Sequence, residues 1–395
     1  MAKRDDLGQA KAAKKDEFYT QLTDIEKEMR YYRKHFKGKT VLCNCDDPFE
    51  SNFFKYFVLN FNRLGLKKLI ATCYATSPIM GQQLSLFDIV GGEEEQRNKP
   101  YKAVVTKVYD VTGDGGVDMF DVAELFKSHE NELTELEGDG DFRSEECLTL
   151  LDEADIIVTN PPFSLFREYV GILIEHQKKF IIIGNVNAIT YKEIFPLLKN
   201  NLMWIGASIH SGDRAFYVPD DYPLNAAGCG VDEDGRKFIR VKGVRWYTNL
   251  DYKQRHDELI LVKRYSCQAY KTYDNYDAIN VDKTADIPCD YSGAMGVPIT
   301  FLDKYCPDQF EIIALGHLKD NFTPNKTYIN PKKHRKDGSI VSGESLNSDL
   351  AYMVSDKPAG QVYYSADNAS GYLVVPYARI LIRNKHPEQP KEVQQ

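Results

Sequence analysis

Short apolar runs alternate with amphipathic segments along the first half of the chain. Runs of four to seven residues rich in Val and Ile are typical of strands enclosed on both faces of a sheet. They stand at TVLCN (40–44), KKLIATC (67–73), DIIVTN (155–160), KFIIIG (179–184) and LMWIGAS (202–208). Helical patterns lie between them at 51–65, 165–176 and 190–200, the first with Ser51 as N-cap and Gly65 at its end. This alternation predicts an α/β fold with a doubly wound, mostly parallel sheet.

Other segments have weaker patterns. Residues 23–35 and 121–136 look helical, YKAVVTKVY (101–109) resembles a strand, and 75–100 has no clear period. After residue 210, loops rich in Tyr, Asn, Asp and Gly separate strand-like runs at 237–250, at 258–265 (ELILVKRY) and at the edge-strand candidate RILIRNKH (379–386). We therefore expect a flexible basic tail at 1–15, a main domain at 16–210 with an insertion at about 75–137, and a recognition region with C-terminal elements at 211–395.

Composition narrows the class of protein. An apolar content of 43% with 12% aromatic residues is that of a globular protein. No apolar stretch approaches the length of a membrane span, and the start lacks the core of a signal peptide, so we expect a cytoplasmic protein without a membrane partner. The eight cysteines include no C-x-x-C pair, which favours buried, reduced thiols over zinc ligands or disulfides.

Charge is unevenly distributed along the chain. The net charge is −8, which argues against a nucleic-acid partner, but residues 110–155 alone contribute −14. The remaining chain therefore carries +6, with basic clusters within 30–39, 240–245 and 332–336 that could meet phosphates. Each cluster could equally be solvated surface. Composition thus permits a nucleic-acid partner without requiring one.

The stretch DIIVTNPPF carries a distinct chemistry. The strand must stop at Asn160, because Pro161 and Pro162 cannot donate to a sheet ladder. Its loop then lies at a carboxyl-terminal strand edge, where open α/β sheets bind ligands. The Asn160 side-chain oxygen and the Pro161 carbonyl can hold the two hydrogens of an exocyclic amine, and Phe163 can stack on a base. The motif is characteristic of amino-group methyltransferases that use S-adenosylmethionine, whereas the alternative is a plain strand-ending turn.

Longer blocks extend the likeness beyond these four residues. They are DEFYTQLTDIEKE (16–28), VLCNCDDP (41–48), SNFFKYF (51–57), LGLKKLIATCY (64–74), GDGDFRS (138–144), IIVTNPPFSLFREY (156–169), NVNAITYKE (185–193) and WYTNLD (246–251). In these blocks the chain resembles the EcoRI-type adenine-N6 DNA methyltransferases. The likeness covers nearly all of 16–74 and 138–310 and the terminal RILIRNK, and it is weakest at 75–137 and 311–372.

The resemblance implies a Rossmann-like S-adenosylmethionine-dependent methyltransferase with a C-terminal DNA-recognition region. It would act as a monomer on N6 of adenine in double-stranded DNA, in restriction–modification or as an orphan or phage-type methylase. Asn160 and Pro161 would accept hydrogen bonds from the adenine amine, Pro162 would stiffen the loop, and Phe163 would stack on the base. The target adenine must first be flipped out of the duplex. Methylation of RNA bases or of protein glutamine, and a non-catalytic DNA-binding decoy, stay as alternatives.

The family pattern also points to cofactor residues. FYT at 18–20 matches a motif whose threonine contacts the cofactor carboxylate, so Tyr19 and Thr20 are candidates. Asp141 and Phe142 fall where a carboxylate and an aromatic ring usually read the cofactor adenine, with Asp139 as a rival.

The turn after the first strand departs from the usual pattern. Many relatives have a glycine-rich turn there, but this chain has CNCDDPFES. Asp46 and Asp47 stand at the carboxyl end of the strand and are candidates for cofactor contact. Asp47 could instead cap the following helix. The acidic residue that usually follows the second strand is missing, which leaves ribose recognition unassigned.

Residues 110–121, DVTGDGGVDMFD, have the spacing of a calcium loop. Oxygen donors fall at positions 1, 3, 5, 9 and 12, and Gly115 occupies the sharp turn at position 6. An Asp/Gly-rich turn without metal is the alternative. The residues that would bind a structural calcium ion are Asp110, Thr112, Asp114, Gly116, Asp118 and Asp121.

Target recognition is expected after residue 210. Lys, Asn and aromatic side chains are the types that meet phosphates, base edges and displaced bases. Ordinary packing of an irregular module is the alternative for each candidate. The candidates for DNA contact are Trp246, Lys271, Tyr273, Asn275 and Tyr276.

Overall fold

The chain divides into two compact units. The computed structural model describes residues 20–45, 48, 51–73, 100–218, 224, 228–317 and 322–389. Unit 1 comprises Met1–Val186 and Met203–Tyr252, and unit 2 comprises Asn187–Leu202 and Lys253–Gln395. The division differs from the expected boundary at 210. Residues 203–252 belong to unit 1 because β11 (Val244–Thr248) pairs with β6 (Lys179–Asn185).

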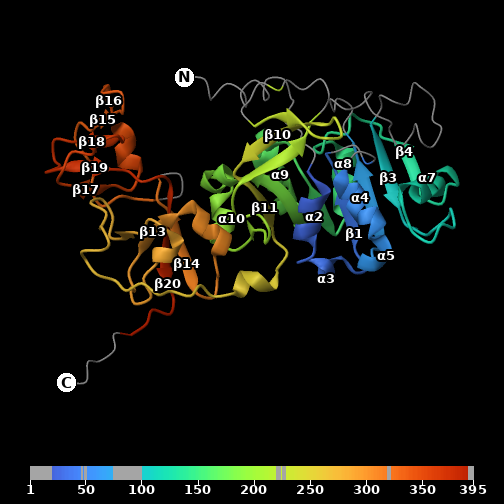
Figure 1. Ribbon diagram of the computed structural model, residues 1–395, viewed down its shortest axis with the longest axis horizontal. Coiled ribbons are helices and arrows are strands. Elements are labelled where there is room, and N and C mark those ends of the chain that lie inside the picture. Colours follow the sequence, from blue (N-terminus) through green and yellow to red (C-terminus); the bar gives the residue numbers. More distant parts are fainter. Residues whose placement is uncertain are drawn as a thin grey trace. The chain divides into compact units, whose positions relative to one another are not determined.

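An eight-stranded sheet forms the centre of unit 1 (Figure 1). Its four parallel strands lie in the order β2 (Lys68–Thr72), β1 (Thr40–Cys43), β5 (Ile156–Thr159) and β6. Antiparallel pairs flank them, with β3 (Tyr101–Val105) and β4 (Glu132–Glu135) on one side and β11 and β7 (Trp204–Ile205) on the other. The α/β class is confirmed, but the sheet is mixed and not mostly parallel. Residues 100–137, part of the expected insertion, belong to the sheet, because they supply its strands β3 and β4.

The central strands form where the sequence has continuous apolar runs. Every residue of β1 and β5 is buried, as expected for parallel strands covered on both faces. The chain leaves β1 toward β2 on one side, whereas β5 and β6 lie on the other side of β1. The strand order therefore reverses at β1, beside β5, and this position matters for the site.

The helices of unit 1 follow the sequence with some interruptions. The segment 23–35 splits into α2 (Leu22–Met29) and α3 (Arg33–Phe36), and 51–65 splits into α4 (Asn52–Leu59) and α5 (Phe61–Leu64). Ser51 caps α4 by accepting hydrogen bonds from two backbone N–H groups, and Gly65 ends α5 with φ +64°. α8 (Glu145–Glu153) precedes β5, and α9 (Phe166–Glu175) follows it.

One helix expectation is wrong over half its length. α7 (Met119–Lys127) ends at Lys127, and residues within 128–136 include strand β4 instead of more helix. Pairing with β3 overrides the local helical pattern there. A small antiparallel sheet completes unit 1, in the order β8 (Asp213–Tyr217), β10 (Lys237–Lys242) and β9 (Gly230–Val231).

Unit 2 contains α10 (Phe195–Lys199), shorter than the helix expected at 190–200, and two sheets. The first sheet has the order β12 (Ile279–Asn280), β13 (Met295–Pro298), β20 (Arg379–Asn384) and β14 (Phe310–Leu315). RILIRNKH is thus an interior strand and not an edge, because β20 pairs with both β13 and β14. The expectation of a strand at 258–265 is also wrong, since this segment makes only an isolated bridge at Lys263.

The second sheet of unit 2 arises within 311–372, where the family resemblance is weakest. Its order is β16 (Ile340–Ser342), β15 (Lys332–His334), β18 (Tyr363–Ser365), β19 (Tyr372–Val374) and β17 (Tyr352–Val354). Tyr364 and Leu373 point from one face into a small core with Tyr328 and Leu346.

The structure shows the state of the cysteines and the lengths of the helices. All eight cysteines are free thiols, and five are buried, whereas Cys267 is exposed and Cys45 and Cys229 are partly exposed. The expected burial is therefore found for five of them. Among the helices that the structure describes, none has the length and apolar character needed to cross a membrane.

Candidate active site

The junction between β5 and α9 carries the Asn-Pro-Pro-Phe motif. Asn160 directly follows β5 and is only 3% exposed, and both prolines are buried. The Pro162 carbonyl accepts a hydrogen bond from the Leu165 N–H at 3.0 Å, which closes a 3-10 turn at Phe163–Leu165. This turn uses the Pro162 carbonyl and not the Pro161 carbonyl. The chain thus leaves a buried strand and enters α9 through a short, fixed turn that holds Asn160, Pro161 and Phe163 together.

Aromatic packing anchors the start of α9 on the sheet. The Phe166 ring lies 5.1 Å from the Tyr247 ring, centroid to centroid. Gly184 on β6 makes room for both, since a Cβ there would lie 2.5 Å from Phe166 Cε2 and 3.0 Å from Tyr247 Cε2. Phe163 itself is partly buried and packs against the main core of unit 1. The motif therefore stands on rigid elements.

The segment after β1 is tied to this junction. The Thr159 hydroxyl donates a hydrogen bond to the Asn44 carbonyl, and the Tyr169 hydroxyl donates to Asn44 Oδ1 at 2.5 Å. Burial raises the pKa of Tyr169 well above its usual value, so its hydroxyl stays protonated. Cys45 follows with φ +82°, a left-handed conformation that is strained for a residue with a side chain. A cysteine thus takes up the backbone geometry that a glycine-rich turn would supply.

A third loop, residues 138–144, joins the same strand ends. Gly140 has φ +78°, and a Cβ at this position would collide with the carbonyl oxygen of Cys73, which follows β2. Only glycine allows this close approach. Further along the loop, the Phe142 ring lies edge-on to the Tyr169 ring with centroids 5.0 Å apart. The loop therefore reaches from the end of β2 to α9.

Asp141 is oriented by its neighbour Arg143. Asp141 Oδ1 accepts hydrogen bonds from the Arg143 backbone N–H (2.9 Å) and Nε (2.8 Å), and Oδ2 accepts one from Nη2 (2.6 Å). Arg143 also pairs with Glu168 on α9 at 3.2 Å, and the hydrogen bonds that it donates to Asp141 raise the pKa of the guanidinium. Asp139, the rival candidate, accepts from the Asp141 N–H and shapes the turn. The Asp139 carboxylate therefore stabilises the turn, whereas the Asp141 carboxylate is oriented by Arg143.

Thr20 lies at the start of α4. Asn52 Nδ2 donates to the Thr20 carbonyl at 2.7 Å, which fixes the chain beside the first turn of the helix. The Thr20 hydroxyl is buried and has no hydrogen-bond partner among the described residues. A buried polar atom in this state costs free energy unless a ligand or a water satisfies it. Tyr19, Asp46 and Asp47, the other candidates here, lie outside the described residues.

Two residues of this region were missed by sequence reasoning. Asn44 and Tyr169 connect the loop after β1 with the junction after β5, yet neither belongs to a recognisable motif. The available signal was a polar residue directly after a buried strand, because the carboxyl ends of neighbouring parallel strands meet at one sheet edge. Tyr169 lies nine residues after Asn160 and gave no such signal.

The loop at 110–121 does not look like a metal site. Asp110 accepts hydrogen bonds from the backbone N–H groups of Gly113 and Gly115, and Asp114 accepts from that of Gly116. Asp121 accepts from three further N–H groups of the loop. Among the described residues, no group of three or more His, Cys, Asp or Glu side chains is placed to hold a metal ion. The structure therefore gives the calcium prediction no support.

Most of the expected DNA-contacting side chains are structural. Trp246 on β11 is fully buried and lies 6.0 Å from the Phe53 ring in the core of unit 1. Its assignment to direct DNA contact is wrong, because its position in the sheet places it inside. Tyr273 is buried as well, and its hydroxyl donates to Asn280 Oδ1 at 2.8 Å.

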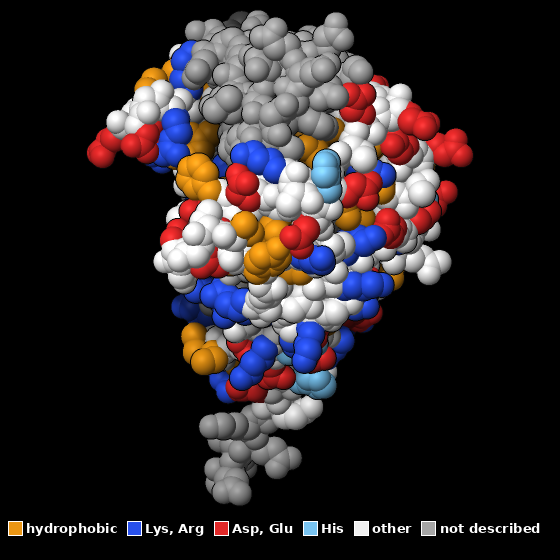
Figure 2. All heavy atoms as spheres, turned by 90° about the vertical axis from the view of Figure 1, so that its right-hand side faces the viewer, with side chains coloured by type: hydrophobic (Ala, Val, Ile, Leu, Met, Phe, Trp, Pro, Cys, Tyr) orange, Lys and Arg blue, Asp and Glu red, His pale blue; other side chains and the backbone are white. Residues whose placement is uncertain are grey.

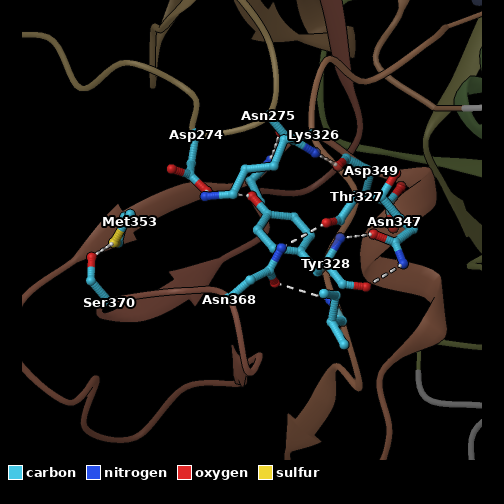
Figure 3. A network of polar contacts seen from close by, with 12 residues as sticks. Asp274, Asn275, Lys326, Thr327, Tyr328, Asn347, Asp349, Met353, Asn368 and Ser370 are labelled. Carbon is cyan, nitrogen blue, oxygen red and sulfur yellow. Dashed lines mark hydrogen bonds and ion pairs between the residues drawn. The ribbon is translucent and has the colours of Figure 1, made fainter.

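Asn275 is fully buried in unit 2 and belongs to a polar network drawn in Figure 3. Its side chain donates to the Asp349 carbonyl and accepts from the Ala351 N–H, which also excludes the proposed DNA contact. Neighbouring Asp274 accepts from Lys326 Nζ at 2.7 Å and from the Tyr328 hydroxyl at 2.9 Å. Tyr276 packs against Phe322, whereas Lys271 stays exposed above the Tyr352 ring.

Comparison with known proteins now decides the family. The family model described as "Adenine-specific methyltransferase EcoRI" matches residues 6–385. The chain belongs to this family. Methyltransferases of this family use S-adenosylmethionine, and the expectation of an adenine-specific methyltransferase is confirmed.

Curated relatives agree over most of the chain. The chain is 48% identical to the Type II methyltransferase M.EcoRI of Escherichia coli over 310 residues, which cover 78% of this chain and 88% of that protein. It is 37% identical to M.MpnI of Mycoplasma pneumoniae over 343 residues (86% and 94%) and 36% identical to M.MgeORF184P of Mycoplasma genitalium over 344 residues (86% and 95%). No solved structure matches.

Proposed function

We propose that this member of the EcoRI family is a site-specific Type II methyltransferase that methylates N6 of a flipped adenine in double-stranded DNA. One observation carries the proposal: hydrogen bonds from Thr159 and Tyr169 tie Asn44, after β1, to the segment that bears Asn160, after β5. This junction lies at the carboxyl ends of β1 and β5, where the strand order reverses and where doubly wound, Rossmann-like sheets bind ligands. Amide, hydroxyl and carbonyl groups are thereby concentrated at one sheet edge.

The motif suits an amine nucleophile. Asn160 Oδ1 and the Pro161 carbonyl would accept the two N6 hydrogens, which favours the tetrahedral nitrogen that forms as its lone pair attacks the methyl carbon. Pro162 keeps the Pro161 carbonyl in one direction, and Phe163 stacks on the adenine. S-adenosylmethionine supplies the methyl group when bound, with its carbon–sulfur bond breaking and one amine proton leaving to solvent. The chain's contribution is orientation and preorganised acceptors.

The described cofactor candidates fit that molecule. The buried Thr20 hydroxyl has no hydrogen-bond partner among the described residues and lies beside the first turn of α4, where the positive end of the helix dipole favours an anion such as a carboxylate. Phe142 offers a ring next to Tyr169, and Asp141 is held in place by Arg143 to accept from an adenine amine. Tyr19, Asp46 and Asp47 remain predictions from the family pattern.

We also propose that the C-terminal region reads the target sequence and that the enzyme acts as a cytoplasmic monomer. Most of this region is unit 2, whose irregular loops and small sheets differ from the large sheet of unit 1. Methylation of RNA bases or of protein glutamine is the alternative enzymatic function. A DNA-binding decoy without catalytic activity is the alternative that is not an enzyme.

A labelling experiment tests the proposal. Incubation of the protein with methyl-labelled S-adenosylmethionine and plasmid DNA should place label on N6 of adenine at one short sequence. Asn160→Ala should lower the rate of transfer by about 10² or more, because one preorganised acceptor is lost. The control Asn200→Ala, at an exposed position at the end of α10, should transfer at the wild-type rate with an equal melting temperature. Label in RNA or protein only, or no transfer at all, would overturn the proposal.

A further inference from the structure

A basic hairpin projects from the second sheet of unit 2 (Figure 1). β15 and β16 pair antiparallel, and the turn between them is closed by the Arg335 N–H to the Ser339 carbonyl at 2.9 Å. Gly338 takes φ +83° in this turn, and Asp337 Oδ1 accepts from the Ser339 N–H and hydroxyl. The hairpin is therefore held by its own hydrogen bonds and presents a fixed surface. The basic residues of this hairpin are Lys332, Lys333, Arg335 and Lys336.

These four cations are not neutralised. Within the part of the chain that the structure describes, none of them forms an ion pair, although other cations of unit 2 do. Lys326, for example, pairs with Asp274 at 2.7 Å, and Arg264 pairs with Glu388 at 2.7 Å. The only acid in the turn is Asp337, whose carboxylate accepts hydrogen bonds from Ser339 and interacts electrostatically with Arg335, so that four cations face one carboxylate. The hairpin thus keeps an uncompensated positive charge.

Aromatic rings contact the hairpin from both faces of its sheet, because the successive pairs Lys333–Tyr364 and His334–Tyr363 point to opposite faces. The His334 ring stacks on the Tyr363 ring with centroids 4.4 Å apart and planes 8° apart, and Lys357 Nζ lies 5.9 Å from the same tyrosine. Lys333 Nζ lies 5.6 Å from the Tyr364 ring. Burial, together with the nearby charges of Lys357 and Lys332, lowers the pKa of His334. The field that opposes a proton on His334 would attract an anion.

We propose that this basic hairpin, residues 332–342 with Lys357, is a docking surface for the phosphate backbone of the DNA duplex. The inference rests on the proposed function, because it adds a second contact region on the substrate of the same enzyme. Fixed, unpaired Lys and Arg side chains next to aromatic rings are the combination that tracks a polyanionic backbone. Phosphate contacts position a protein without reading bases, so the hairpin would act on every sequence alike.

A charge-matched pair of variants tests the hairpin. The test variant carries Lys332→Ser, Arg335→Ser and Lys336→Ser, all at exposed positions. The control carries Arg63→Ser, Lys67→Ser and Lys179→Ser, exposed positions near the amino ends of β2 and β6, away from the strand ends that bear Asn44 and Asn160. Both variants lower the net charge by the same amount. Any difference between them therefore reports position and not overall charge.

Binding to a labelled 30-base-pair duplex is measured by fluorescence anisotropy from 50 to 300 mM salt. The test variant should bind about tenfold more weakly at 0.1 M salt, and the slope of log Kd against log salt should fall by about 2 to 3. The loss should be equal for duplexes with and without the methylation site. The control should stay within about twofold of wild type, and melting temperatures should agree for all three proteins.

The outcomes separate this inference from the proposed function. Wild-type affinity and salt slope in the test variant, an equal loss in the control, or a loss seen only with an RNA duplex would each overturn the hairpin proposal. At saturating DNA the test variant should transfer methyl groups with the wild-type kcat and a raised KM for DNA. A wild-type protein that binds DNA through the hairpin but never methylates it would contradict the proposed function alone.

Discussion

At the residue scale, Tyr169 holds two loops of unit 1 together. Its hydroxyl donates to Asn44 Oδ1 in a fully buried position, and its ring packs against Phe142. Tyr169→Phe keeps the ring and removes only the hydroxyl, which leaves Asn44 Oδ1 without this donor at a cost of about 1 to 3 kcal/mol. We expect a lower melting temperature and a raised Kd for S-adenosylmethionine by calorimetry. Tyr265→Phe, at a partly exposed position where the hydroxyl has no hydrogen bond to the described residues, is the matched control and should change neither. Unaltered cofactor binding in Tyr169→Phe would remove its positioning role.

The positions of some single residues could be predicted from the sequence, and those of others could not. Asn160 and its prolines could be placed correctly at a strand end, because the signals that stop a strand are local. Trp246 and Asn275 could not, because their residue types suit both DNA contact and packing. Pairing of β11 with β6, which buries Trp246, joins residues 59 to 67 positions apart, and no local pattern in the sequence indicates it.

At the element scale, the loop at 110–121 is organised by Asp121. Its Oδ1 accepts from the N–H groups of Val111 and Thr112, and its Oδ2 accepts from that of Asp118. These backbone hydrogen bonds lower the pKa of Asp121, with the bond from Asp118 as the largest cause. The Asp121 carboxylate thus holds the loop in its conformation, which is the role that a bound cation has in a calcium loop.

Replacement of Asp121 by Asn tests this account. Asp121→Asn should lower the melting temperature, and the loss should be the same with a chelator as with added calcium. Because the folded-state pKa is lowered, the stabilisation by Asp121 is present above its unfolded value and is lost as pH falls through the folded value. The difference between wild type and variant should therefore shrink in acid. A calcium-dependent rise in the wild-type melting temperature would instead restore the calcium prediction.

Elements were predictable in proportion to their local signals. Ser51 and Gly65 mark the two ends of 51–65 because caps depend on neighbouring residues. The place of a strand in a sheet depends on partners elsewhere in the chain. For that reason the sequence wrongly predicts an edge strand at RILIRNKH, which pairs on both sides. It also wrongly predicts helix at 128–136, which contains β4.

At the scale of the whole molecule, net charge is a poor guide to the partner. Figure 2 views the side of the protein that carries α7 and β4, and acidic side chains gather along the upper part of that face. These elements lie in the segment 110–155 that contributes −14. Such a face repels phosphate, whereas the basic hairpin of unit 2 attracts it. The sign of the total charge averages over both surfaces and hides each.

Cofactor binding should be visible in the stability of the whole protein. At a concentration of S-adenosylmethionine about 100 times its Kd, mass action adds about 2.7 kcal/mol to the free energy of unfolding. Thr20→Val removes only the buried hydroxyl that has no hydrogen-bond partner among the described residues. Without cofactor this variant should be as stable as wild type or slightly more stable, because no hydrogen bond is lost. Tenfold weaker cofactor binding would then reduce the gain to about 1.4 kcal/mol at the same concentration.

Thr248→Val is the matched control for this measurement. The Thr248 hydroxyl donates to the Phe180 carbonyl at 2.7 Å and accepts from the Leu250 N–H at 3.0 Å. Its removal should destabilise the protein by about 1 to 3 kcal/mol yet leave the cofactor-induced gain intact. Thermal unfolding with and without S-adenosylmethionine distinguishes the two threonines. If Thr20→Val lost stability without cofactor and kept the full gain with it, the hydroxyl would be a structural group and the cofactor carboxylate would lie elsewhere.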